Sequence, residues 1–283
     1  MRKPSRRTTL AAMLALLVFA ALTSVTSANH SWGNYHWART SNPFTLQVGN
    51  NVNSVWDSYL DEAISDWSQS TVLDLTKVTG GTRPRQCRPT SGRIEACNAS
   101  YGSTGWLGIA QIWASGSHIT QALTKVNDTY FNTAQYNTPA WRRMVMCQEI
   151  AHDFGLDHQD ENFSNPNLGS CMDYTNDPEG GGAYGPSNEH PNQHDFDQLL
   201  SIYGHGDSTG TVGQTVFGHK DAAGETPPAM NDIDLEGRRQ WGRLIRSSPK
   251  GRVQLYELDF GNGHKVFTHV LWADGEEGGR GGR

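Results

Sequence analysis

The sequence predicts an α+β fold, and three observations lead to this prediction. Helix-like and strand-like stretches follow one another over the first part of the chain. An irregular run rich in Asn, Asp, Gly and Pro occupies residues 155–185. Three short strand-like runs end the chain after a linker. A chain of this kind is expected to pack helices against a mixed sheet.

Composition and charge exclude one large class of function. The chain has 283 residues, with 23 basic and 29 acidic residues and a formal charge of −6. The first 27 residues carry four basic residues and no acidic one, so the remainder has 19 against 29, a charge of −10. A nucleic-acid binder needs a basic surface. We therefore expect no nucleic-acid partner.

The N-terminus is typical of a secretory signal. Arg2, Lys3, Arg6 and Arg7 precede an apolar run at 10–22, and small residues follow. The apolar run is shorter than the roughly 20 residues that a membrane span needs. We expect residues 1–27 to be a cleaved signal peptide. We then expect the mature chain to be secreted into the extracellular space and to have no membrane contact. We also expect it to be a monomer.

The elements of residues 28–205 are predicted from periodicity and turn residues. Apolar residues recur every three to five positions at 53–68 and predict a helix, whereas the polar, glycine-containing stretch at 80–98 predicts a loop. Alternating or apolar runs predict strands at 32–47, 72–78, 106–113 and 118–126, the last two joined in a hairpin.

Two further helices have sequence signals at both ends. Thr138 is a suitable N-cap and Pro139 a suitable first residue for a helix at 138–154, and Gly155 follows its end. A helix is also predicted at 192–203, with Gly204 as its stop.

The C-terminal third is divided by composition. Residues 206–235 are rich in Gly, Ser, Thr and Pro without periodicity, which predicts a linker. A small β-rich segment is expected at 236–274 and a disordered tail at 275–283. This segment is expected to be a structural appendage; a cap over a cleft or a substrate-binding surface is the alternative. Its strands are predicted at 242–245, 253–259 and 266–272.

The cysteines fit an exported protein. Four cysteines are an even set, which predicts two disulfides in an oxidising compartment. Of the three possible pairings we favour Cys87–Cys97 with Cys147–Cys171. A four-cysteine zinc site is disfavoured because no C-x-x-C pair is present.

The chemistry is concentrated at the end of the predicted helix at 138–154. Gln148 and His152 are one helical turn apart and point the same way, with Glu149 beside them. Gly155 allows a sharp turn that can carry His158 back towards His152. Three side chains are thus able to converge on one metal ion.

This stretch resembles the metzincin zinc-protease motif H-E-x-x-H-x-x-G-x-x-H, with Gln148 in the place of the first histidine. Residues 170–174, which contain Met172 and Tyr174, resemble the Met-turn of that family. Residues 194–204 are similar to the closing helix of matrixin-type members. The likeness covers roughly residues 32–205.

The resemblance implies a catalytic domain at 28–205, with a twisted mixed sheet, an active-site helix, an irregular lower subdomain and a closing helix. It implies a zinc-dependent endopeptidase that hydrolyses a protein or peptide substrate with a metal-activated water. Glu149 would be the general base and Tyr174 would assist the oxyanion. Zn2+ would be held by His152, His158 and Gln148. The substrate would pair with an exposed edge strand at 107–113.

The glutamine leaves three possibilities open, because an amide oxygen is a weak zinc ligand. Gln148 ligates through its side-chain oxygen, or another group replaces it, or the site is empty. In the last case the chain is a catalytically inactive secreted binding protein on the same fold. Candidates for the replacing group are His118, His190, His194 and water. No chemistry is assigned to His205, His219, His264 or His269.

Overall fold

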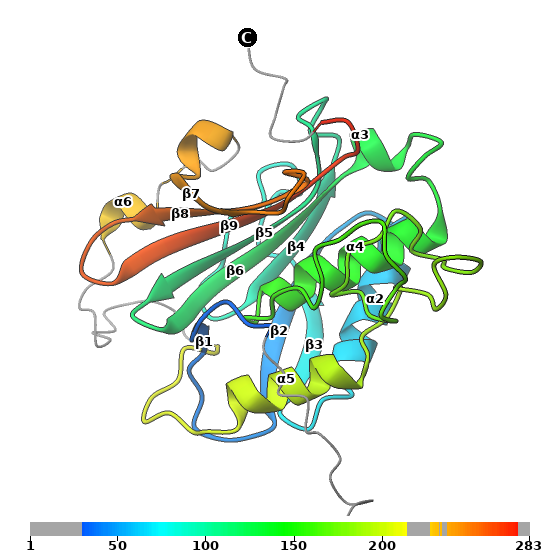
Figure 1. The fold of residues 1–283 in the computed structure, drawn as a ribbon. Helices are drawn as coiled ribbons and strands as arrows, with labels where there is room; N and C mark the ends of the chain where they lie inside the picture. Colours follow the sequence, from blue (N-terminus) through cyan, green and yellow to red (C-terminus); the bar gives the residue numbers. More distant parts are fainter. Residues whose placement is uncertain (1–29, 214–226, 232, 234–236, 277–283) are drawn as a thin grey trace, which may run out of the picture.

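The computed structural model describes residues 30–213, 227–231, 233 and 237–276. Within them the strands form one nine-stranded sheet in the order β3-β2-β4-β6-β5-β9-β8-β7, with β1 paired beside β6 (Figure 1). The predicted α+β class is confirmed. The predicted signal peptide lies outside the described residues, as do much of the predicted linker and most of the predicted tail.

The strands match most of the predicted runs. The predicted strand at 32–47 forms only in part, as a two-residue β1 and the first residues of β2. The nine strands of the described residues are β1 His36–Trp37, β2 Phe44–Asn51, β3 Leu73–Thr79, β4 Ile94–Ala99, β5 Trp106–Ser115, β6 His118–Asn127, β7 Arg243–Ser247, β8 Val253–Asp259 and β9 His264–Trp272.

Helices α4 and α5 begin where they are predicted, whereas α2 begins four residues after the predicted start at 53 and has no side-chain cap. The Thr138 side chain accepts a hydrogen bond from the backbone N–H of Trp141, and Pro139 is the first residue of α4. Asn192 and Asp195 form a capping box at the start of α5. The helices are α2 Asp57–Trp67, α3 Asp128–Phe131, α4 Pro139–His152, α5 Gln193–Tyr203, α6 Pro228–Asn231 and the 3-10 helix η1 Arg238–Gln240.

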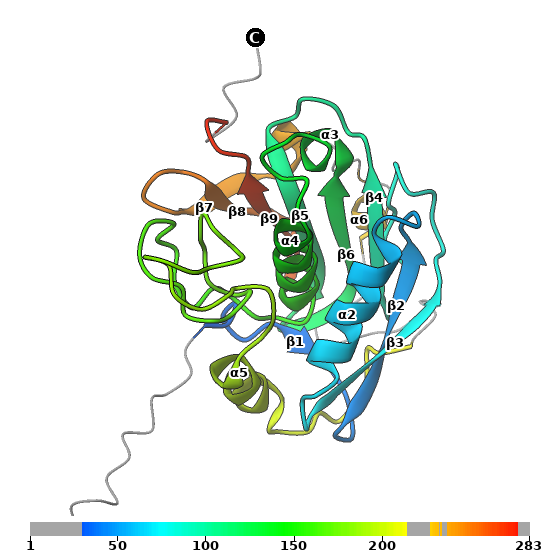
Figure 2. The ribbon, with the colours of Figure 1, turned by 90° about the vertical axis from the view of Figure 1, so that its right-hand side faces the viewer.

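Helices α2 and α4 cover one face of the sheet (Figure 2). Strands β2, β3, β4 and β6 run parallel, and β5 is antiparallel to β6. Every residue of β5 is buried. On the opposite face a second apolar cluster joins the strands to the C-terminal segment; it includes Trp106, Trp113, Met230, Trp241, Tyr256 and Trp272. Both faces of the central strands are therefore covered.

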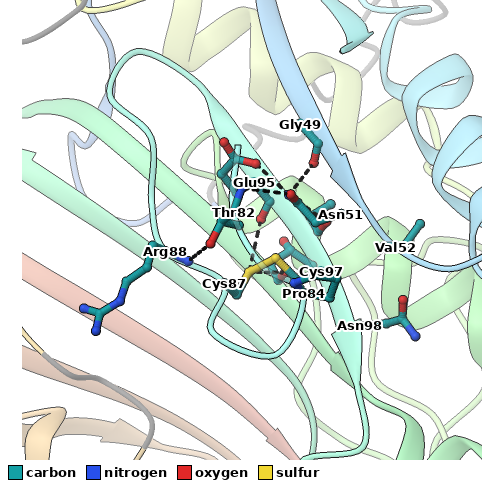
Figure 3. Close-up of a disulfide and its surroundings, with 12 residues drawn as sticks. Gly49, Asn51, Val52, Thr82, Pro84, Cys87, Arg88, Glu95, Cys97 and Asn98 are labelled. Atoms are coloured by element: carbon teal, nitrogen blue, oxygen red, sulfur yellow. Dashed lines mark hydrogen bonds between the residues drawn. A yellow bond between two sulfur atoms is a disulfide. The ribbon is translucent and has the colours of Figure 1, made fainter. Parts of the chain in front are cut away.

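The predicted loop at 80–98 is wrong at its end, because β4 lies there between β2 and β6. The charged residues of this stretch interrupt the apolar pattern that would have predicted the strand. Glu95 is fully buried, and its carboxylate accepts hydrogen bonds from Arg93 at 2.6 and 2.8 Å. It also accepts a hydrogen bond from Asn51 at 2.6 Å (Figure 3). A buried carboxylate is tolerated when it is paired in this way.

Both predicted disulfide pairings are confirmed. Cys87–Cys97 fastens the loop before β4 to that strand (Figure 3). Cys147–Cys171 joins α4 to the irregular segment that follows it. Among the described residues, no helix is both long and apolar enough to cross a lipid bilayer.

The C-terminal strands extend the main sheet. Strand β9 pairs antiparallel with β5 along its length, β8 pairs with β9, and β7 pairs with β8 (Figure 1). The prediction that 107–113 is an exposed edge strand is therefore wrong. Strand β9 holds its place because its side chains enter both apolar cores: Phe267 and Leu271 pack on the side of α4, Val266 and Val270 on the other.

Candidate metal centre

Helix α4 and the turn after it bring two histidines together. His152 is the last residue of the helix, and Gly155 then adopts a φ of 93°. A Cβ atom at position 155 would lie 2.4 Å from the carbonyl oxygen of Tyr35, so glycine is required there. The turn carries His158 back until its Nε2 lies 2.9 Å from Nε2 of His152.

A third histidine comes from the C-terminal segment. His269 lies on β9, opposite Ala110 of β5. Its ring is 4.0 Å from that of His152 and 4.9 Å from that of His158, centroid to centroid. One ring nitrogen from each of these three residues lies within 4.8 Å of the other two. Such a cluster has the nitrogen donors that zinc prefers.

The other ring nitrogen of each histidine faces an oxygen acceptor. The carbonyl oxygen of Leu156 accepts from Nδ1 of His152 at 2.8 Å. Nδ1 of His269 lies 3.2 Å from Oε2 of Glu149, and Nδ1 of His158 lies 3.2 Å from the carboxylate of Asp157. Nδ1 protons on His152 and His269 leave lone pairs on their Nε2 atoms. Nδ1 of His158 makes no hydrogen bond with the described residues, and its Nε2 faces that of His152. This arrangement is typical of metal-binding histidines, and a cation between the rings would accept their lone pairs.

Burial also favours the metal-binding form of these rings. It lowers the pKa of His152 and of His269 well below the ordinary value, and the neighbouring histidines lower both further. Neutral imidazole is the form that binds a metal ion. The residues present therefore fit a zinc ion.

Glu149 and Tyr174 complete the cluster. The Oε1 atom of Glu149 has no hydrogen-bond partner, and burial, with a smaller contribution from Asp153, raises the pKa of this carboxyl well above its usual range. The hydroxyl of Tyr174 lies 2.5 Å from Nε2 of His158 and 3.0 Å from Nε2 of His269. Burial, and then the Glu149 charge, raise the pKa of Tyr174, so the hydroxyl keeps its proton.

A glycine of β5 makes room for Glu149. A Cβ atom at Gly108 would lie 2.5 Å from Oε1 of Glu149 and less than 3 Å from two of its side-chain carbons. Any larger residue there would displace the carboxyl group. The sequence gives no signal for this contact, because α4 and β5 meet only in the folded chain.

Gln148 lies beside the cluster but is held by another partner. Its Nε2 donates to the carbonyl oxygen of Cys171 at 2.8 Å, and its Oε1 is buried without a hydrogen-bond partner. The side-chain oxygen is thus free of competing contacts, and its role as a zinc ligand stays a prediction.

The histidines proposed as substitutes for Gln148 lie elsewhere. His190 pairs with Asp66, His194 stacks on His30, and His118 lies beside Asp207. Sequence reasoning missed His269, which follows Glu149 by 120 positions and belongs to no motif. Its one signal is a polar residue inside the apolar run at 266–272.

The C-terminal segment closes the site. Gln148, Glu149, His152, Tyr174 and His269 are each 0% exposed, and His158 is 7% exposed. Arg246 on β7 binds both carboxylate oxygens of Asp157, the residue before His158. Burial raises the pKa of Asp157, but the contacts with His158 and Arg246 outweigh it, and the net pKa lies well below the usual value.

Comparisons with known proteins give no family. No protein-family model and no curated protein matches the sequence. Thirty-one chains of solved structures are similar to a part of this chain. One is high choriolytic enzyme 1, a hatching enzyme zinc-protease from Oryzias latipes (Medaka fish), with a TM-score of 0.35 and 11% identity over 61% of this chain and 96% of that one. Another is myroilysin, with a TM-score of 0.33 and 12% identity over 59% and 82%. Likeness at this level assigns neither family nor activity, so the functional argument rests on the site itself.

Proposed function

We propose that this chain is a secreted, zinc-dependent endopeptidase whose metal ion is held by His152, His158 and His269. One observation carries the proposal: three buried imidazoles each bring a ring nitrogen within 4.8 Å of the other two, and an oxygen lies within 3.2 Å of each Nδ1. The motif at 148–158 supplies Glu149, His152 and His158 of this site.

The chain's own residues have distinct roles in this proposal. Bound zinc would supply a Lewis acid and lower the pKa of a coordinated water. Glu149 would take a proton at Oε1, the oxygen that has no other partner. Tyr174 would donate its hydroxyl hydrogen to the developing oxyanion. The substrate class is a protein or peptide, and we propose a monomer that needs neither nucleic acid nor membrane.

The described conformation is a closed one. Strand β9 occupies the edge of β5 with an antiparallel ladder, and the site residues beneath it are buried. His269 also engages Glu149. Hydrolysis therefore requires β9 to leave β5. Gln148, whose Oε1 is free of hydrogen bonds, would then take the position that His269 leaves.

One observation favours a second candidate function. Because the whole cluster is buried under β9, the chain would also serve as an inactive secreted binding protein whose zinc ion is purely structural. Under that function no variant of the full chain cleaves a peptide, although zinc is bound.

The test measures zinc per chain and cleavage of a casein-type substrate on the same samples of the full chain. His152→Ala is expected to lose the ion held by this cluster. Gln148→His combined with His269→Ala is expected to keep the ion and to cleave faster than the wild type. Glu149→Gln in that double variant is the control and is expected to bind zinc without cleavage. The same number of zinc ions with the same affinities in His152→Ala as in the wild type would contradict the metal centre. Zinc binding without cleavage in the double variant would favour the inactive protein.

A further inference from the structure

A second group of metal-ligating side chains lies away from the site at α4. His36 belongs to β1, and His118 lies opposite it at the start of β6. His205 and Asp207 follow α5. These four residues come from three separate parts of the chain, and the proposed hydrolysis uses none of them.

Three of these residues, His36, His205 and Asp207, each offer a ligand atom within 4.8 Å of the other two. Nε2 of His36 lies 3.3 Å from Nε2 of His205. Oδ1 of Asp207 lies 3.5 Å from Nε2 of His36, 3.5 Å from Nε2 of His118 and 3.7 Å from Nε2 of His205. Zinc bonds to nitrogen and oxygen are about 2.0–2.1 Å long, so tetrahedral ligand atoms lie roughly 3.3 Å apart. His36, His205 and Asp207 therefore have spacings close to those of a tetrahedral site. His118 lies near Asp207 but outside this set of three, so its ring would have to move to become the fourth ligand.

Two of the four groups are already oriented by other contacts. Nδ1 of His36 donates to the carbonyl oxygen of Asn34 at 2.7 Å, which leaves the lone pair of a neutral ring on Nε2. The second carboxylate oxygen of Asp207 accepts from Nη1 of Arg39 at 2.7 Å and from the backbone N–H of Arg39 at 3.2 Å. Oδ1 is then the oxygen that faces the histidines. Contacts of this kind hold the ligands of known metal sites in place.

A network of ordinary ion pairs explains only part of this arrangement. The contact with Arg39 accounts for one oxygen of Asp207. When the His36 ring is neutral, the lone pair of its Nε2 faces a second acceptor, Oδ1 of Asp207. A metal cation between the two atoms removes that conflict, as does a second proton on the ring. The group is also reachable from solvent, because the His205 side chain is 50% exposed.

We propose that His36, His118, His205 and Asp207 bind a second divalent metal ion, and that zinc is the ion they fit. Three imidazoles with one carboxylate are a ligand set that suits zinc. The ion would tie the chain after α5 to the pair of β1 and β6. This role is structural and does not depend on the proposed hydrolysis.

The test uses Zn2+ alone as the probe and the full chain as the protein. Zinc per chain and zinc affinity are measured by chelator competition. His205→Ala is the informative variant, because a half-exposed side chain can be removed without opening the core. His190→Ala is the matched control: its side chain is 49% exposed and, like His205, lies near an aspartate. Circular dichroism checks that both variants fold.

The expected results separate this site from the one at α4. The wild type and His190→Ala bind two zinc ions. His205→Ala and Asp207→Asn each weaken one of the two by at least roughly tenfold. The double variant His152→Ala with His158→Ala keeps the ion that His205→Ala loses. Zinc is also expected to raise the midpoint of thermal unfolding more in His190→Ala than in His205→Ala.

Two results would overturn the proposal. One is zinc binding by His205→Ala with wild-type number and affinity. The other is a wild type that binds a single ion, lost in His152→Ala and retained in His205→Ala. The second result leaves the proposed endopeptidase intact, whereas loss of zinc only in His205→Ala would remove the endopeptidase and keep this site.

Discussion

Nδ1 of His269 on β9 lies 3.2 Å from Oε2 of Glu149 on α4. Strand β9 pairs with β5, and α4 packs against β5. A residue from the last strand of the chain thus contacts the carboxylate of the motif at 148–158. This contact links the proposed metal centre to the position of the C-terminal segment. Any change that moves β9 is expected to alter the metal site as well.

His269→Ala is expected to weaken zinc binding by the cluster at α4 by roughly 10–100-fold or more, because one of three imidazoles is lost. Adding Gln148→His should restore most of the affinity, since position 148 is one helical turn from His152. Chelator competition measures both. The matched control is His264→Ala, on the same strand and outside the cluster. Equal zinc affinity in His269→Ala and the wild type would mean that His269 is not a ligand.

Arg246→Ala is expected to loosen the C-terminal segment. Asp157 is nearly buried, and removing Arg246 leaves its carboxylate with His158 as its remaining partner. Arg246 itself is partly exposed, so we expect a loss of only about 1–2 kcal/mol in the free energy of unfolding. Cleavage should rise because β9 leaves β5 more often. Urea denaturation and the casein-type assay measure the two effects.

The control for this variant is Arg243→Ala on the same strand. Its ion pair with Glu257 is exposed at the arginine, whose side chain is 76% exposed. That variant should change neither stability nor cleavage. If Arg246→Ala lost stability without any gain in cleavage, release of β9 from β5 would not limit the reaction.

Gly108→Ala is expected to displace the carboxyl of Glu149. The new Cβ would lie 2.5 Å from Oε1, so the side chain or the strand must shift. Overpacking of this kind costs about 1–3 kcal/mol of stability. We expect reduced cleavage in the Gln148→His, His269→Ala background, with zinc still bound. Gly206→Ala, where a Cβ atom meets nothing within 4 Å, is the control. Unchanged stability and cleavage in Gly108→Ala would show that the strand yields without strain.

Stability is expected to fall as the pH drops from about 6.5 to about 4, and His30 contributes to this. Burial first, and then the charge of His194, lower the pKa of His30 from 6.5 to about 4. The unfolded chain therefore takes up a proton in this range while the folded chain does not, so the folded state loses stability as pH falls. The full difference is on the order of 3 kcal/mol.

His30→Gln tests this pH dependence. Nε2 of His30 contacts Asp195, whose pKa is raised by burial. The raised pKa of Asp195 acts in the opposite direction, so the measured slope should be smaller than that of His30 alone. Urea denaturation between pH 4 and 7 should give a flatter profile for His30→Gln than for the wild type. Parallel profiles would exclude a role for His30.

Local signals in the sequence determined a large part of the structure. Thr138, Pro139 and Asn192 set the starts of α4 and α5, because caps and first-turn residues act within one helical turn. Gly155 allowed the prediction that His158 returns towards His152, and the structure places their Nε2 atoms 2.9 Å apart. The favoured disulfide pairings also agree with the structure.

Only the tertiary structure decided the rest. The sequence of β4 predicts a polar loop because it contains the charged Glu95. In the structure Arg93 pairs with the buried Glu95, and hydrophobic periodicity does not reveal such a pairing. The pairing of β9 with β5, and with it the place of His269, depends on contacts between residues far apart in the chain. Period-two patterns show that a strand exists and which residues share a face, but not which strand it joins. The partner is chosen by the two apolar cores that β9 fills, and these exist only once the chain has folded.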